Sequence, residues 1–143
     1  MLRIGLLGCG RIGQVHARSL MRLETAKLVA VSDAFADAAE TLAAATGAAV
    51  RSTDEILSAS DIDAVIICTP TDTHYALIHG AAQNGKAIFC EKPVDMSADR
   101  IVECIKVVTQ NNVAFLTAFN RRFDPNFAAI QSRIAAGEIG AVE

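Results

Sequence analysis

The sequence lacks the features that mark several broad classes of protein. It has no run of lysine or arginine and its net charge is −3, so nothing in it favours a nucleic-acid partner or an anionic membrane. No apolar stretch reaches transmembrane length, and the short apolar run after Arg3 is too brief for a signal peptide. Its four cysteines form no CxxC pair. Widely spaced cysteines in such a chain are mostly small, buried apolar residues. Their pattern therefore predicts a reduced, cytoplasmic protein without a metal site.

Composition and hydrophobic pattern indicate one globular α/β domain. The 143 residues are 52% hydrophobic and 20% charged, as in ordinary folded proteins, and no linker, repeat or low-complexity tract interrupts them. Short β-rich runs alternate with helix-period stretches, which predicts a doubly wound parallel sheet. The expected strands are 2–7, 27–32, 48–50, 64–68, 87–90 and 113–118. The expected helices are 11–22, 34–46, a short one capped by Ser52 or Thr53, 74–84, 97–111 and 125–136.

The end of the chain does not fit a finished sheet of this type. Asp124 and Pro125 have the pattern of a helix N-cap followed by the first helical residue. After that helix, residues 137–143 have the pattern of a turn and the first residues of a further strand, starting at Ala141. We therefore expect a two-domain protein cut short, with a frayed tail as the alternative.

A glycine-rich turn follows the first strand. Residues 8–13, Gly-Cys-Gly-Arg-Ile-Gly, fit the pattern G-x-G-x-x-G between a strand and a helix. Gly8 permits the tight turn, Gly10 lets the backbone approach a pyrophosphate, and Gly13 lets the helix pack closely on the strand. The helix N-terminus offers free N–H groups and a partial positive charge to the phosphates. The turn therefore predicts a dinucleotide site.

Asp33, at the tip of the second strand, strengthens that prediction. A carboxylate at this position accepts hydrogen bonds from the hydroxyls of the adenosine ribose, each contributing roughly 1.5–3 kcal/mol. It also repels a 2′-phosphate, and neither Ala34 nor Phe35 supplies a compensating cation, so NAD is favoured over NADP. Arg11, in the glycine-rich turn, is the residue whose positive charge would reduce this preference for NAD over NADP. As an alternative or additional role, Asp33 would be the N-cap of a helix starting at Ala34.

Two other kinds of protein have a similar N-terminal pattern of strand, glycine-rich turn and helix. S-adenosylmethionine-dependent methyltransferases combine a glycine-rich turn with an acid after the second strand, and NAD-sensing regulators bind the cofactor without reacting it. The loops that follow the later strands must decide between them, because ligands of open parallel sheets lie at the carboxyl ends of the strands. These loops are residues 68–74, 90–95 and 119–125, and all three are polar.

The loop with the sequence Glu91-Lys92-Pro93 carries the best candidate for a reacting group. Lys92 is expected to point toward the nicotinamide, where the positive charge of the oxidised ring would favour a neutral amine able to relay a proton. An ion pair with Glu91 on the rim is the alternative, and the Lys92–Pro93 bond is a candidate for the cis form. His74 is expected at a helix start, where surface or capping roles are more common than ligand contact.

Four segments occur in the order seen in one known family. They are 8–17, Thr69-Pro70 with His74, 91–93, and 120–125. The chain resembles the glucose–fructose oxidoreductase/inositol dehydrogenase/MocA family over nearly its whole length, and within it most resembles the inositol 2-dehydrogenases. The Glu-Lys-Pro loop is the most specific element of this resemblance.

The resemblance implies a two-domain, NAD-dependent enzyme that oxidises a ring hydroxyl of a polyol or sugar, with myo-inositol as the favoured substrate, and that assembles as a tetramer. Residues 1–120 would be the NAD(P)-binding Rossmann domain and 121–143 the connection to a second, substrate-binding domain. Lys92 matches the catalytic lysine, whose Asp and His partners would lie beyond the chain, so the fragment is expected to bind NAD weakly and turn over little inositol. Lys92 and Arg122 are the expected substrate contacts. The residues alone leave open which of Arg121 and Arg122 binds a polar substrate, and pairing with Glu91 or Asp124 is the alternative. The expected cofactor contacts are Gly8, Gly10, Arg11, Ile12, Gly13, Asp33, Thr69, Pro70, His74, Glu91 and Lys92.

Overall fold

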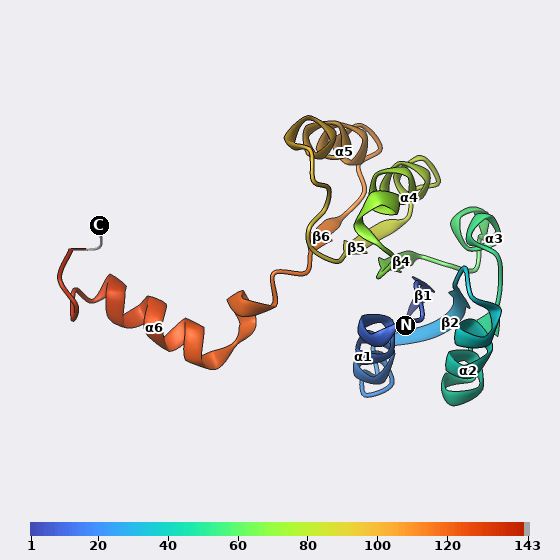
Figure 1. The fold of residues 1–143 in the computed structure, drawn as a ribbon, viewed down its shortest axis with the longest axis horizontal. Helices are drawn as coiled ribbons and strands as arrows, with labels where there is room; N and C mark the ends of the chain where they lie inside the picture. Colours follow the sequence, from blue (N-terminus) through green and yellow to red (C-terminus); the bar gives the residue numbers. More distant parts are fainter. Residues whose placement is uncertain (142–143) are drawn as a thin grey trace.

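Six parallel strands form the centre of the structure, a computed structural model that describes residues 1–141 (Figure 1). Their order across the sheet is β3-β2-β1-β4-β5-β6, so the chain first builds outward from β1 on one side and then crosses over to build the other side. This is the doubly wound topology expected from the sequence. The strands are β1 (Leu2–Leu7), β2 (Ala26–Ser32), β3 (Ala49–Val50), β4 (Ala64–Ile67), β5 (Ala87–Cys90) and β6 (Phe115–Thr117).

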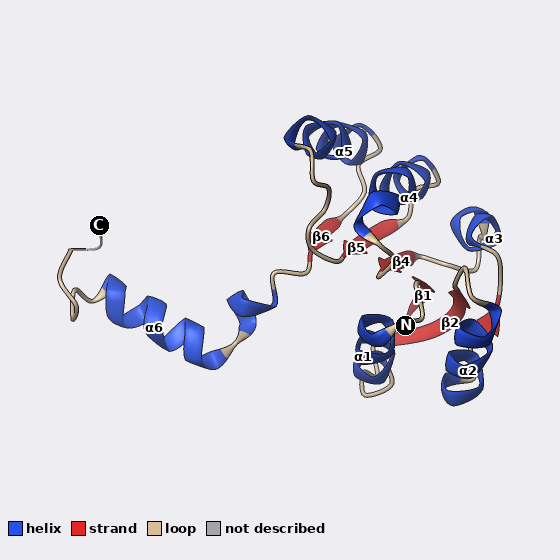
Figure 2. Ribbon diagram, viewed as in Figure 1, coloured by secondary structure: helices blue, strands red, loops and turns tan. Residues whose placement is uncertain are grey.

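Helices cover both faces of this sheet (Figure 2). In the view of Figure 1, α1 and α2 lie below the strands, while α3, α4 and α5 lie above them. Among residues 1–141, no helix combines the length and the apolar character needed to cross a membrane. The helices are α1 (Arg11–Leu20), α2 (Ala36–Thr46), α3 (Thr53–Ser58), α4 (Thr71–Gln83), α5 (Ala98–Gln110) and α6 (Pro125–Ala135), with a short 3₁₀ turn η1 (Asn120–Phe123) before the last.

Side-chain caps define the starts of three helices. Ser52 accepts from the backbone N–H of Glu55, and the Glu55 carboxylate accepts in return from Ser52, which lowers the pKa of that carboxyl. Ser97, expected as the first residue of a helix, is the N-cap of α5. Asp124 caps α6 with Pro125 at the first helical position, as the sequence predicts. These elements therefore begin within one residue of their expected positions.

Two helices begin at positions that the sequence did not predict. α2 starts at Ala36 rather than residue 34, because the Asp33 carboxylate accepts from the N–H of Phe35 and holds the intervening residues in a turn. α4 starts at Thr71 rather than residue 74, because the carbonyl of Pro70 already accepts the first helical hydrogen bond, from the N–H of Thr73. The last expected strand, from Ala141, runs into residues 142 and 143, which lie outside the described residues.

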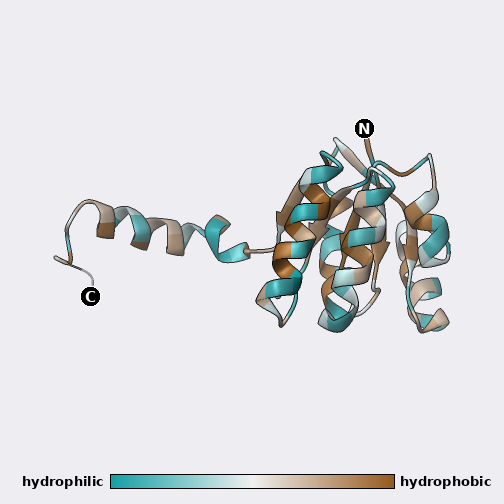
Figure 3. Cartoon of the chain, turned by 90° about the horizontal axis from the view of Figure 1, so that it is seen from above, coloured by the Kyte–Doolittle hydropathy of each residue, from teal (hydrophilic) through white to brown (hydrophobic). Residues whose placement is uncertain are grey.

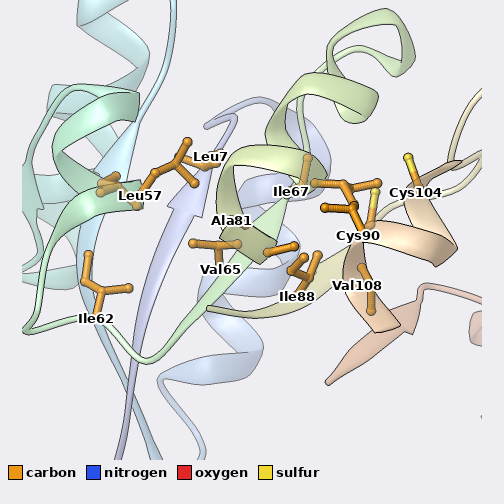
Figure 4. Close-up of a cluster of buried hydrophobic side chains, with 14 of the residues drawn as sticks. Leu7, Leu57, Ile62, Val65, Ile67, Ala81, Ile88, Cys90, Cys104 and Val108 are labelled. Carbon is orange, nitrogen blue, oxygen red and sulfur yellow. The ribbon is translucent and has the colours of Figure 1, made fainter. Parts of the chain in front are cut away.

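The core consists of two apolar clusters, one on each face of the sheet. Figure 4 shows the cluster under α3, α4 and α5, where side chains of β1, β4 and β5 meet those of the helices. All four residues of β4 are buried, as the unbroken apolar run predicts. Fully buried side chains such as Ile67 and Ile78 each contribute about 1.5–3 kcal/mol by leaving water.

The sheet face that carries α1 and α2 is not fully covered by the described chain. An apolar hollow of about 410 Å³ lies on this face, lined by residues of β1, β4, β5 and β6 and by α1. Helix α6 extends away from the sheet with every residue exposed, and Figure 3 shows apolar and polar positions mixed along it. Phe127, Ile130 and Ile134 form its apolar stripe.

The close packing of α1 on β1 gives a first testable prediction. A Cβ at Gly13 would lie 2.0 Å from the carbonyl oxygen of Gly8, so Gly13→Ala forces the helix away from the turn. We expect the free energy of unfolding, measured by urea denaturation, to fall by about 1–3 kcal/mol. Gly10→Ala is the matched control, because a Cβ there meets no atom within 4 Å and the φ of −67° suits alanine. Its expected cost, from the poorer N-cap, is below about 1 kcal/mol, and equal losses in the two variants would contradict the prediction.

Candidate functional site

The strand register brings the candidate residues to one edge of the sheet. Leu7 of β1 lies level with Ser32 of β2 and with Ile67 of β4, and Ile67 lies level with Cys90 of β5. The residue after each of these therefore leaves the sheet at the same edge, its carboxyl edge. These next residues are Gly8, Asp33, Cys68 and Glu91.

A cleft of about 860 Å³ opens at this edge. The glycine-rich turn forms its floor, and its walls come from the loops after β2, β3 and β4 and from one turn of α4. The lining residues are Gly8, Gly10, Arg11, Ile12, Ser32, Asp33, Ala34, Phe35, Ser52, Thr53, Cys68, Thr69, Pro70, Thr73 and Leu77.

The three glycines of the turn differ in what they permit. Gly8 has a φ of +96°, and a Cβ there would lie 2.6 Å from the backbone carbon of Cys68, so both its conformation and its surroundings require glycine. Gly13 allows the close helix packing described above. Gly10 faces open space, so the absence of its side chain enlarges the cleft. The fold therefore requires glycine at positions 8 and 13, whereas Gly10 leaves room for a ligand against the backbone.

Asp33 joins the turn to the second strand. One carboxylate oxygen accepts from the N–H of Cys9 at 2.6 Å and the other accepts from the N–H of Phe35 at 2.9 Å. Asp33 does not cap α2, whose N-cap is Phe35, so the interpretation of Asp33 as that cap is wrong. A carboxylate has about four acceptor positions, so two remain for hydroxyl donors in the cleft.

A second hollow, of about 330 Å³, continues from the first toward the Lys92 loop. The two hollows share Arg11, Ile12, Cys68, Thr69 and Pro70, so they form one continuous path. The further residues of the second hollow are Thr71, His74, Glu91, Lys92, Ala118 and Asn120. Apart from the buried Gly13, every cofactor position expected from the sequence lines one of the two hollows.

His74 is buried in a way that the sequence did not predict. Only 1% of it is exposed, and its two ring nitrogens lie 2.9 Å from the carbonyl oxygens of Thr69 and Pro93. The interpretation of His74 as a surface or capping residue is therefore wrong. Its ring joins the loop after β4 to the loop after β5 and lines the second hollow.

The loop that carries Lys92 has a cis peptide bond between Lys92 and Pro93, which confirms the sequence expectation. Glu91 does not pair with the Lys92 side chain. One of its carboxylate oxygens lies 2.8 Å from Nε2 of His16 on α1, and the other accepts from the backbone N–H of Lys92 at 3.2 Å. Lys92 itself is exposed within the described part of the chain.

The two arginines after β6 do not reach the hollow that contains Lys92. The guanidinium of Arg121 lies 4.7 Å from the ring centre of Phe127, and that of Arg122 lies 5.8 Å from the ring centre of Phe119. Both arginines are exposed and line a separate surface hollow at the start of α6. In this structure, therefore, Arg122 is not brought together with Lys92.

Cys68 lies where the two hollows meet, in surroundings that favour the neutral thiol over the thiolate. Burial, with a smaller effect from the carboxylate of Glu91, raises the pKa of the Cys68 thiol to about 12. The pKa of Cys9 is raised to about 11, first by burial and then by Asp33. Among residues 1–141 no group of three or more His, Cys, Asp or Glu side chains could hold a metal ion.

These features fit a dinucleotide. The floor of the cleft lacks a side chain where the backbone would meet a diphosphate, the N-terminus of α1 points into it, and the adjacent carboxylate retains acceptor capacity for a diol. A family model described as "Oxidoreductase family, NAD-binding Rossmann fold" matches residues 2–119. The chain belongs to this family, the Gfo/Idh/MocA oxidoreductases.

Known members of the Gfo/Idh/MocA family are similar to nearly the whole chain. Inositol 2-dehydrogenase of Rhizobium meliloti is 55% identical over 142 residues, which are 99% of this chain and 43% of that protein. The scyllo-inositol dehydrogenase of Lactobacillus casei, solved with NAD(H) and scyllo-inositol, superposes with a TM-score of 0.91 at 30% identity, over 98% of this chain and 42% of that one. A myo-inositol dehydrogenase from Corynebacterium glutamicum superposes with a TM-score of 0.87 at 41% sequence identity, and the match covers 100% of this chain and 43% of that one. The chain thus spans less than half the length of these relatives.

Three features of the site were missed in the sequence. His16 contacts Glu91 across 75 residues of chain, a pairing that no local pattern signals. Ser52 and Thr53 were predicted only as helix caps but also line the cleft. The sequence prediction for Phe35 concerns only its lack of charge, although its position two residues after the acid at the strand tip is a usable signal for a residue of the cleft.

The raised thiol pKa gives a second prediction. In the folded chain at neutral pH, Cys68 should be alkylated by iodoacetamide on the order of a thousandfold more slowly than in the urea-unfolded chain, because only the thiolate reacts. Peptide mass spectrometry after timed quenching measures the rate at Cys68 separately from the other cysteines. The rate should still be rising in the folded chain above pH 9, where unfolded thiols have largely ionised. Equal rates in the folded and unfolded chains at neutral pH would contradict the assignment.

Proposed function

We propose that this chain is the NAD-binding part of a dehydrogenase that oxidises a ring hydroxyl of a cyclic polyol, with myo-inositol as the favoured substrate. The observation that carries the proposal is the continuous path from Asp33, over the glycine-rich turn, to Lys92. The inositol dehydrogenases among its relatives support the substrate class.

Each residue of the path has a proposed role. The turn, through Gly8, Gly10, Ile12 and Gly13 and with the help of Arg11, binds the diphosphate at the N-terminus of α1. Asp33 accepts from the hydroxyls of the adenosine ribose, and its charge excludes a 2′-phosphate. The contacts on the nicotinamide side are Thr69, Pro70, His74, Glu91 and Lys92.

Oxidation of an alcohol needs a group that takes up the hydroxyl proton. NAD supplies the hydride acceptor when it is bound. Lys92 is the group of this chain that we place at the reacting hydroxyl, with its amine accepting or relaying the proton. Glu91 orients the backbone of Lys92 instead of contacting substrate, since its carboxylate bonds to His16 and to the Lys92 N–H. Arg122 would contact substrate only after the segment of η1 and α6 packs closer to the site.

The proposal includes a second domain. Residues 1–120 form the cofactor domain and 121–143 the connection, which fits the exposed stripe of α6 and the apolar hollow on the sheet. The assembled protein is a homo-oligomer, a tetramer, of the cytoplasm. The four free cysteines, three of them buried, agree with a reducing compartment.

Cofactor binding is tested by titrating the chain with NADH and NADPH, following nucleotide fluorescence. We expect NADH to bind at least tenfold more tightly, because Asp33 repels the additional phosphate. Gly10→Ala should weaken NADH binding at least tenfold while leaving the unfolding transition nearly unchanged, since its methyl group fills the space proposed for the diphosphate. Tighter binding of NADPH, or binding of S-adenosylmethionine in place of NADH, would contradict the proposal.

Turnover is tested in a chimera that joins this chain to the part of the Rhizobium meliloti enzyme beyond the aligned region. We expect NAD-dependent oxidation of myo-inositol, and a loss of at least a hundredfold in kcat in Lys92→Ala, because the hydroxyl proton then has no positioned acceptor. Lys106→Ala, an exposed lysine on α5, is the control and should keep full activity. The chain alone should show little turnover.

An NAD-sensing regulator is the alternative function. A chimera that binds NADH but oxidises no polyol or sugar, with Lys92→Ala indistinguishable from the unmodified protein, would favour it. Turnover of another sugar in preference to inositol would keep the reaction class and change only the substrate.

A further inference from the structure

Phe35 is an exposed aromatic residue at the edge of the cleft. Its side chain is 77% exposed, one of the largest values among the apolar residues described, yet it lines the cleft instead of lying on an outer surface. Among the residues that line this cleft, Phe35 is the only one with an aromatic ring. An aromatic side chain placed beside a ligand-sized space offers a flat apolar surface to whatever enters it.

The position of Phe35 relative to Asp33 is restrained by the backbone. The N–H of Phe35 donates to the Asp33 carboxylate at 2.9 Å, and two residues of chain separate their Cα atoms by at most about 7 Å. Any ring system attached to a sugar that Asp33 holds is therefore within reach of the Phe35 side chain. Leu77 of α4 and Ala34 add apolar surface to the same cleft.

We infer that Phe35 is the stacking surface for the purine base of the nucleotide in this cleft. The inference deepens the proposed function, on which it rests. Aromatic rings stack on nucleobases with a gain equivalent to about 5- to 100-fold in affinity. The exposure of Phe35 is then the exposure of a binding surface.

Truncation of the ring tests the inference. Phe35→Ala should weaken binding of NADH and of ADP-ribose by about 5- to 100-fold, and Phe35→Tyr should stay within about threefold of the unmodified chain. Binding of nicotinamide mononucleotide, which has no adenine, should not change in either variant. Phe123→Ala is the matched control, since Phe123 is 76% exposed and lies outside the cleft. Circular dichroism confirms that each variant is folded.

A spectroscopic readout reports the contact itself. The chain contains no tryptophan, so Phe35→Trp introduces a single indole at the proposed surface. ADP-ribose or AMP should quench its fluorescence in a saturable way, because a stacked purine quenches indole emission, whereas nicotinamide mononucleotide should not. In Phe123→Trp neither ligand should change the emission.

The outcomes separate this inference from the proposed function. If NADH binds equally well to Phe35→Ala and to the unmodified chain, and the indole at position 35 is not quenched, the stacking role is wrong while the NAD site stands. If the unmodified chain binds no NADH, both are wrong. An equal loss of affinity for all three ligands, including nicotinamide mononucleotide, would also overturn the inference, because the effect would then be structural.

Discussion

The close approach of the Gly8 backbone to the backbone of Cys68 is the constraint on which the rest of the site depends. It brings the exits of β1 and β4 into direct contact, and this is sterically allowed because Gly8 has no Cβ and takes a positive φ. Gly13 then lets α1 begin directly above the turn. The Asp33 carboxylate bonds to the Cys9 N–H and so joins the exit of β2 to the same point. Three strand ends are thereby held around one floor by contacts within the chain itself, which lowers the ordering cost of ligand binding.

The fold was predictable because its signals are local. Unbroken apolar runs identify buried parallel strands, and caps such as Ser52 and Asp124 identify helix starts, since each depends on residues close in the chain. The errors occurred where a longer-range or competing bond decided the boundary. Asp33 delays α2 by its bonds to two backbone N–H groups, one of them 24 residues away, and the carbonyl of Pro70 begins α4 early. Helix propensity describes each residue by itself, so it does not reflect the competition between these hydrogen bonds and the regular helical ones.

The candidate site was predictable in its composition but not in its pairings. The motif and the strand order place the glycine-rich turn, Asp33 and the Lys92 loop at one edge, so membership follows from topology alone. The partners of each side chain depend instead on packing across the sheet. The His74 ring lies within hydrogen-bond distance of two carbonyl oxygens, and the Glu91 carboxylate, which the sequence suggested as a partner of Lys92, pairs with His16 instead. These contacts join loops distant in sequence, and no spacing rule encodes them.

The same contacts explain how the chain holds Lys92. The residue before it is bound to α1 through His16, and the residue after it is bound to α4 through His74, whose ring meets the carbonyl of Pro93. The backbone of Lys92 also donates to Glu91. The backbone is thus restrained on both sides, while the ammonium remains in solvent within the described residues. For the proton transfer proposed above, this division means that the backbone contacts of the described chain fix the position of Lys92, while they leave its amine free to meet a substrate in the second hollow.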